Sequence, residues 1–330
     1  MNDHLNNKNF RYSNDNRELD FTDYDYPSQQ SIDSFAQKGE RQFYPNDNGG
    51  YYPNSNRINI DYIDPESNTQ LPNSNSIWTP RNILSQLSMW HDADDKKTIY
   101  ADLGKTTLST DKIAVLEDKT GNPKHDLTQV DQLDQPSYSI MNNSNNKCAI
   151  YFDGDDHMQT AAANIETTPS FSIFIVSELI TIDSGADSLI SFGGAINWQI
   201  QAASNLEFLC RWNSNQTNNT SKTFSNVGLI NPRIFEFIFD LSSSTLSAFV
   251  DGTLLGSTAY TVPHTNARYI LFGNRARNQS PRGWVGENIV VNEATQDTLR
   301  HKIEGYLAHK WGLEQNLPSN HIYKQLSPTL

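Results

Sequence analysis

The chain has 330 residues, of which 36% are apolar, and it carries a formal net charge of −13 with an isoelectric point near 5.0. This acidic balance argues against nucleic acid as a partner, because phosphate binding needs clustered lysine and arginine. The sequence contains no run of about 18 apolar residues and no recognisable signal peptide, so we predict no membrane partner and no disulfide framework. We expect Cys148 and Cys210 to be small buried thiols.

Residues 1–76 differ in composition from the rest of the chain. They contain no valine, tryptophan or cysteine, but they hold seven of the 14 tyrosines. A segment with so few aliphatic side chains cannot bury enough apolar surface to offset its ordering entropy. We therefore predict a long extended arm at 1–76, followed by one folded domain at 77–330.

The arm contains nearly the same phrase twice, FYPNDN from Phe43 and YYPNSN from Tyr51. Aromatic side chains give a large contact area at low entropy cost and act as anchors in partner pockets. We expect the arm to bind another protein through these side chains; the proposed docking residues are Tyr24, Tyr26, Phe43, Tyr44, Tyr51 and Tyr52. The alternative is an acidic tail without fixed contacts.

The domain opens with a short helix, for which Thr79 is the expected N-cap and Pro80 the first residue. Runs with strand character follow, separated by turn residues. The clearest runs are Lys147–Phe152, Ser170–Leu179, Asp187–Phe192, Ile196–Ala202, Leu206–Trp212, Arg233–Leu241, Thr245–Gly252, Ala267–Gly273 and Arg282–Asn292. Short strands with regular turn signals predict an all-β fold, an antiparallel sandwich or barrel. A tight hairpin is expected at Asp251 and Gly252.

One longer helix is expected near the end of the chain. An apolar stripe with a spacing of four residues runs through Leu299, Ile303, Leu307 and Trp311. Thr295 is the expected N-cap, and Gly312 the glycine that ends the helix. Gly305 interrupts this helix, and we expect it to permit close packing against a sheet.

Four phrases resemble one known family. They are Leu87–Asp95 (LSMWHDADD), Leu116–Gln129 (LEDKTGNPKHDLTQ), Cys148–Thr160 (CAIYFDGDDHMQT) and Lys302–Tyr323 (KIEGYLAHKWGLEQNLPSNHIY). They are similar to the concanavalin A-like lectin/glucanase (laminin-G-like) jelly-roll modules found in marine bacteriophage virion proteins and in secreted environmental proteins. The resemblance covers about Ile77–Tyr323. It implies two facing antiparallel sheets with a helix against one edge, but no single function, because that sandwich carries lectins, hydrolases and structural modules alike.

A glycosidase needs two carboxylates across the scissile bond. Glucanases that share this fold supply them from one strand with an E-x-D-x-(x)-E pattern. The nearest pair here is Glu236 and Asp240, which lacks the third acid. We therefore predict that the chain is not an enzyme.

Two aspartate clusters raise the question of a metal. Ca²⁺ prefers six to eight oxygen ligands from such loops, but aspartate also caps turns with no metal involved. No cofactor is required by the sequence, and Ca²⁺ is the one ion it suggests. The candidate ligands are Asp92, Asp94, Asp153 and Asp155.

A glycan site would combine an exposed aromatic platform with polar side chains. The candidates are Trp212, Asn213, Arg275, Arg277 and Trp284. The leading hypothesis is a structural protein of a bacteriophage virion, a capsid decoration or head-fibre protein assembled in the host cytoplasm and bound to other virion subunits, with a homo-oligomer also allowed. The alternative is a lectin-like, carbohydrate-binding module for host-surface glycans, such as a tail-fibre component.

Overall fold

The computed structural model describes residues 43–45, 51–53, 76–141, 144–162, 168–181, 187–192, 198–204, 207–212, 220–225, 231–260, 269–271 and 282–330. The chain divides into two units, residues 1–74 and residues 75–330.

In the first unit, the two copies of the repeated phrase pair with each other. β1 (Phe43–Pro45) and β2 (Tyr51–Pro53) are antiparallel, with Tyr44 opposite Tyr52. Backbone pairing between the two copies is therefore one role of the repeat. Of the residues proposed for docking, Tyr24 and Tyr26 lie outside the described part of the chain, and Phe43, Tyr44, Tyr51 and Tyr52 are described by their backbone alone. Docking of the arm stays a prediction.

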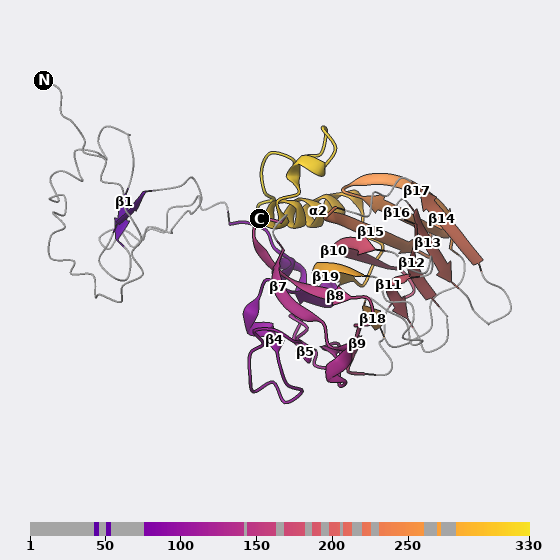
Figure 1. The fold of residues 1–330 in the computed structure, drawn as a ribbon. Coiled ribbons are helices and arrows are strands. Elements are labelled where there is room, and N and C mark those ends of the chain that lie inside the picture. The colour runs from indigo at the N-terminus through magenta and orange to yellow at the C-terminus, as the bar shows by residue number, and fades with distance from the viewer. Residues whose placement is uncertain are drawn as a thin grey trace, which may run out of the picture. The chain divides into compact units, whose positions relative to one another are not determined.

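The second unit contains an eight-stranded antiparallel sheet (Figure 1). Its strands in spatial order are β17 (Thr253–Ala259), β16 (Thr245–Val250), β15 (Arg233–Asp240), β10 (Phe171–Thr181), β19 (Arg282–Val291), β8 (Lys147–Asp153) and β7 (Ser137–Met141). β19 lies in the middle, and its far half pairs with an eighth strand, β3 (Leu87–Asp92).

A nine-stranded sheet accompanies it. Its strands in spatial order are β14 (Thr220–Ser225), β13 (Glu207–Trp212), β12 (Trp198–Ser204), β11 (Asp187–Phe192), β18 (Tyr269–Leu271), β9 (Met158–Thr160), β6 (Leu127–Thr128), β5 (Val115–Leu116) and β4 (Ile99–Tyr100). All the pairings among these strands are antiparallel.

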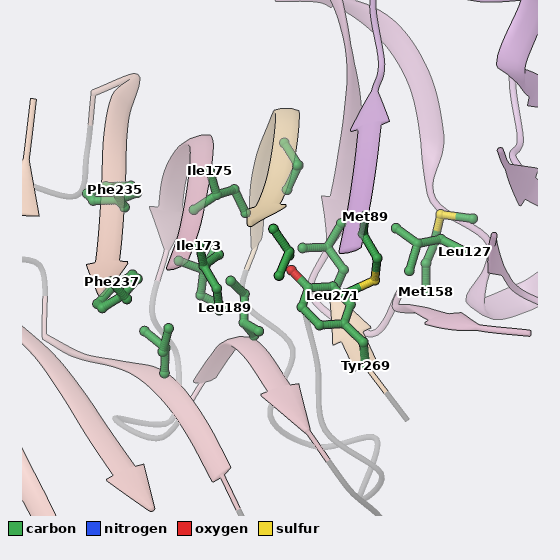
Figure 2. Close-up of a cluster of buried hydrophobic side chains, with 14 of the residues drawn as sticks. Met89, Leu127, Met158, Ile173, Ile175, Leu189, Phe235, Phe237, Tyr269 and Leu271 are labelled. Atoms are coloured by element: carbon green, nitrogen blue, oxygen red, sulfur yellow. The ribbon is translucent and has the colours of Figure 1, made fainter. Parts of the chain in front are cut away.

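The main core joins alternate residues of the two sheets. Ile173, Ile175 and Phe235 come from the eight-stranded sheet, and Leu189 and Leu271 from the nine-stranded sheet (Figure 2). All five side chains are fully buried. Because successive strand residues point to opposite faces, this pattern defines the inner face of each sheet. The predicted all-β sandwich is confirmed.

One α-helix covers the outer face of the eight-stranded sheet. α2 (Asp297–Trp311) buries Ile303, Leu307 and Trp311 against Phe174 and Ile289, residues that alternate with the inner-face set. The described part of the chain also has four short 3₁₀ helices, η1 (Pro80–Gln86), η2 (Lys96–Thr98), η3 (Gln132–Asp134) and η4 (Glu314–Asn316). No helix among the described residues is long and apolar enough to cross a membrane.

Two details of α2 differ from the expectation. The N-cap is Gln296, and the Thr295 hydroxyl donates to Ser172 Oγ (3.2 Å) on β10 instead of capping the helix. Gly305 faces the C-terminal segment rather than a sheet, since a Cβ there would lie 2.5 Å from Tyr323 Cβ. The expected Gly312 does end the helix, with φ of 72°.

Two further predictions are confirmed. Asp251 and Gly252 both have positive φ, 47° and 74°, and they form the tight turn between β16 and β17. Cys148 and Cys210 are buried free thiols, and burial raises the pKa of Cys210.

Candidate carbohydrate-binding surface

A buried carboxylate on β19 organises the contact between the sheet and α2. Glu287 Oε1 accepts hydrogen bonds from Trp90 Nε1 (2.7 Å) and the Tyr306 hydroxyl (2.9 Å). Its Oε2 accepts from Lys310 Nζ (2.7 Å) and Trp311 Nε1 (3.0 Å). We call these five residues the Glu287 hub. The hub satisfies four polar hydrogens that would otherwise be buried without a partner.

The four phrases that carry the family resemblance meet around this hub. Lys310 Nζ also donates to Asp92 Oδ1 (2.5 Å), and Asp92 Oδ2 accepts from Lys119 Nζ (2.8 Å). Asp94 Oδ2 accepts from Lys147 Nζ (2.8 Å), and Asp94 Oδ1 from the amide of Cys148. The phrases therefore build the fold. Burial acts to raise the pKa of Asp92, but the two lysines outweigh it and hold that pKa below its ordinary value. Asp92 and Asp94, both suggested for Ca²⁺, thus contact ammonium groups.

A second buried cluster lies between β15 and α2. Glu236 and Glu304 are both fully buried, and the guanidinium of Arg300 pairs with Glu304. His321 Nε2 donates to Glu304 Oε2 at 2.7 Å, because the Nδ1 of the same ring accepts the Tyr323 amide. Glu236 lies beside Glu304, with which it shares a hydrogen bond, whereas Asp240 accepts the amides of Ser242 and Ser243. Both glutamates are out of reach of a substrate.

The same cluster includes a group of metal-binding type, His301, Glu304 and His321, whose candidate ligand atoms all lie within 4.8 Å of one another. Both imidazoles are already engaged. Arg300 Nη2 donates to His301 Nε2 at 2.9 Å, and His321 donates to Glu304. Arg300 also places a fixed positive charge beside all three residues. The arrangement is that of a buried ion-pair network.

Glu236→Gln should change how the stability of the chain depends on pH. Burial, then the charge of Glu304, raises the pKa of Glu236 well above its usual value. Below the pKa that Glu236 has in the unfolded chain, its neutral carboxyl contributes its full share to the free energy of unfolding. This contribution is lost as pH rises through the higher pKa that Glu236 has in the folded chain. Urea unfolding of the variant should match the wild type near pH 4.5 and give a higher free energy of unfolding at alkaline pH. Parallel profiles for the two proteins would contradict this. Glu293→Gln, at an exposed site, is the control.

A row of partly exposed side chains crosses the outer face of the eight-stranded sheet beyond the hub. In β8, Tyr151 is partly exposed, whereas the other residues from Cys148 to Phe152 are buried. In β19, Trp284 is the only residue after Arg282 that is not buried. In β10, the residues from Phe171 to Ser177 are buried, and Glu178 is the first residue that is not. Trp284 is paired with Tyr151 on one side and with Glu178 on the other. Three neighbouring strands thus reach solvent at one level.

The row continues to Ser137 on β7, which is paired with Tyr151. We call Ser137, Tyr151, Trp284 and Glu178 the aromatic row. The ring centroids of Tyr151 and Trp284 are 4.8 Å apart, with an angle of 49° between the ring planes. Burial raises the pKa of Glu178. At a strand spacing of about 4.8 Å, the row spans about 14 Å. The arrangement is an aromatic platform with a polar group at each end.

A separate hollow of about 480 Å³ lies on the opposite side of β7, next to η3. Its lining consists of Ala101, Thr107, Leu108, Ser109, Thr110, Asp111, Lys112, Gln132, Leu133 and Gln135. It has no aromatic side chain, so it lacks the stacking surface that the aromatic row provides.

The structure brings only one predicted glycan residue into the aromatic row, Trp284. Asn213, Arg275 and Arg277 lie outside the described residues, and Trp212 is described by its backbone alone. The row contains three residues that the sequence reasoning missed, Ser137, Tyr151 and Glu178. A period of two in the run Lys147–Phe152 would have placed Tyr151 on the same face as Ala149.

The sequence matches no family model and no curated protein. Among the solved structures that resemble it, the binding domain of Paraclostridial Mosquitocidal Protein 1 is 12% identical over 69% of this chain and 53% of that chain, with a TM-score of 0.48. The binding domain of botulinum neurotoxin DC in complex with SialylT is 13% identical over 65% of this chain and 52% of that chain, with a TM-score of 0.41.

The Ruminococcus gnavus IT-sialidase CBM40 bound to alpha2,3 sialyllactose is 10% identical over 40% of this chain and 80% of that chain, with a TM-score of 0.36. The chain spans about half the length of the two toxin binding domains. All three TM-scores lie below 0.5. These likenesses are too distant to indicate a function, so the assignment below depends on the residues of this chain.

Proposed function

We propose that the chain is a carbohydrate-binding module without catalytic activity, and that glycan binds across the aromatic row. One observation carries this proposal: three neighbouring interior strands expose a side chain at the same level, and two of those side chains are aromatic rings in contact. Trp284 also packs against the cluster beneath α2, but the part of the aromatic pair that stays exposed to solvent suits ligand contact.

The chemistry of the row fits a sugar ring. Aromatic faces carry negative charge, so they attract the C–H groups on the apolar face of a pyranose. The Ser137 hydroxyl and the Glu178 carboxyl lie at opposite ends of the row, where they can bond to sugar hydroxyls. Glu178 and the net charge of −13 disfavour acidic sugars, so neutral glycans are the expected class.

The carboxyl groups that a hydrolase would need are elsewhere. Glu236 and Glu304 are fully buried beneath α2, and Arg300 and His321 contact Glu304. The proposal therefore predicts binding without release of reducing ends when oligosaccharides are incubated with the protein.

Trp284→Ala should weaken glycan binding strongly. We expect a loss of about 30-fold or more in affinity, since an aromatic anchor at the centre of a contact surface contributes ~2 kcal/mol or more. The measurement is calorimetric titration with ligands chosen from an array of neutral oligosaccharides and α2,3-sialyllactose. Tyr100→Ala is the matched control, because Tyr100 is a half-buried aromatic residue on β4, in the other sheet.

Three outcomes would reject the proposal. They are no glycan bound by the wild type, equal affinity in Trp284→Ala, or equal loss in Tyr100→Ala. The melting temperature of each variant separates lost binding from lost folding, because Trp284 also packs against the cluster beneath α2.

The role in a bacteriophage virion stays a prediction. It depends on residues 1–76, of which the structure describes the backbone of Phe43–Pro45 and Tyr51–Pro53. A glycan-binding surface on the second unit is compatible with that role and does not require it.

A further inference from the structure

Three aspartates surround the turn between β8 and β9. β8 ends at Asp153, Gly154 follows with φ of 112°, and Asp155 and Asp156 precede Met158, the first residue of β9. One carboxylate oxygen from each aspartate lies within 4.8 Å of the others. Acidic turns are common without a bound ion, so a metal site needs a further observation, which one of the three aspartates provides.

Asp156 is that member. Its side chain is 1% exposed, and its Oδ1 is buried with no hydrogen-bond donor. The nearest cation among the described residues is Lys112, whose Nζ is 3.9 Å away and donates to the Gln135 carbonyl at 2.6 Å. Asp156 Oδ2 accepts the amide of Asp153 at 3.2 Å. A buried carboxylate oxygen without a donor is costly unless something binds it.

We propose that Asp153, Asp155 and Asp156 bind a divalent cation of the calcium class, with the buried Asp156 Oδ1 as the inner ligand. Three carboxylates offer up to six oxygens, and the exposed sides of Asp153 and Asp155 leave room for water. An all-oxygen set on a turn suits Ca²⁺, which accepts irregular geometry, better than Mg²⁺, which requires an octahedron.

This site is independent of the glycan proposal, and its test contains no glycan. The full chain is freed of metal with a chelator and titrated with CaCl₂, with affinity followed by calorimetry and stability by thermal unfolding. At a Ca²⁺ concentration of ~100 times Kd, we expect the melting temperature to rise by roughly 5–10 °C. Asp156→Asn should keep the bond to the Asp153 amide and lose at least ~10-fold in affinity.

Asp102→Asn is the matched control, because Asp102 also accepts backbone amides, those of Thr106 and Thr107, with no neighbouring acid in hydrogen-bond contact. It should respond to Ca²⁺ as the wild type does. No effect of Ca²⁺ on the wild type, or an equal effect on Asp156→Asn, would overturn the proposal. Equal stabilisation by Mg²⁺ would overturn the calcium assignment.

Lys112→Gln gives a test that does not depend on folding of the Asp156 variant. The Lys112 ammonium is the competing positive charge at 3.9 Å, so its removal should tighten Ca²⁺ binding by roughly threefold or more. Unchanged or weaker binding in this variant would reject Asp156 as a ligand.

Discussion

Glu287→Ala is expected to reduce the free energy of unfolding by about 3–5 kcal/mol, which is a large part of the stability of a typical domain. The carboxylate is 1% exposed and accepts four hydrogen bonds. Its removal leaves the indole N–H groups of Trp90 and Trp311 and the hydroxyl of Tyr306 without this acceptor. Lys310 then keeps Asp92 as its carboxylate partner. Urea unfolding monitored by tryptophan fluorescence measures the effect.

Glu287→Gln separates charge from shape. The amide keeps the volume of the side chain but cannot neutralise Lys310, and it presents an NH₂ group where a donor now bonds. We expect a loss of stability between those of the wild type and the alanine variant. Glu293→Ala, on the exposed loop before α2, should change stability by less than ~0.5 kcal/mol. An alanine variant as stable as the wild type would show that the hub does not hold the helix.

Trp311→Ala should reduce the free energy of unfolding by about 3–5 kcal/mol, because it removes the largest fully buried side chain of α2. The indole lies against Gly286, where a Cβ would be 2.6 Å from the ring, so the sheet is shaped around it. Thermal unfolding provides the measurement. Trp311→Phe should cost much less, because it keeps most of the buried area and loses mainly the bond to Glu287.

An unchanged melting temperature in Trp311→Ala would mean that α2 does not depend on this contact. The double variant Glu287→Ala with Trp311→Ala should cost less than the sum of the single variants, since both remove the same hydrogen bond. Additive costs would show that the two side chains act separately.

The strands could be predicted from the sequence where they are long. The run Asp187–Phe192 matches β11 at both ends, and the run Arg282–Asn292 matches β19 except for its last residue. Several shorter strands were missed. β5 and β6 have two residues each, too few for a period to be visible, and β3 lies inside a polar phrase, LSMWHDADD.

The candidate site was predicted only in part, for a physical reason. Trp284 stood out because tryptophan is rare, but its neighbours depend on strand pairing that a linear pattern does not give. Tyr151 and Glu178 approach Trp284 from positions 133 and 106 residues away. The same limit hid Glu287, since its charge has no nearby partner in sequence, and it hid His321, which contacts Glu304 from beyond the helix.

The position of β19 also has a consequence for how the chain is made. This strand forms the middle of its sheet but comes late in the sequence, and the bond between Trp90 and Glu287 joins residues 197 positions apart. At ~5–20 residues per second, synthesis needs about 10–40 s to cover that distance. During that time β10, β8 and β3 have no partner along the edge that β19 later pairs with. Unpaired strand edges promote aggregation, so we expect slower growth at low temperature to raise the soluble yield of the chain.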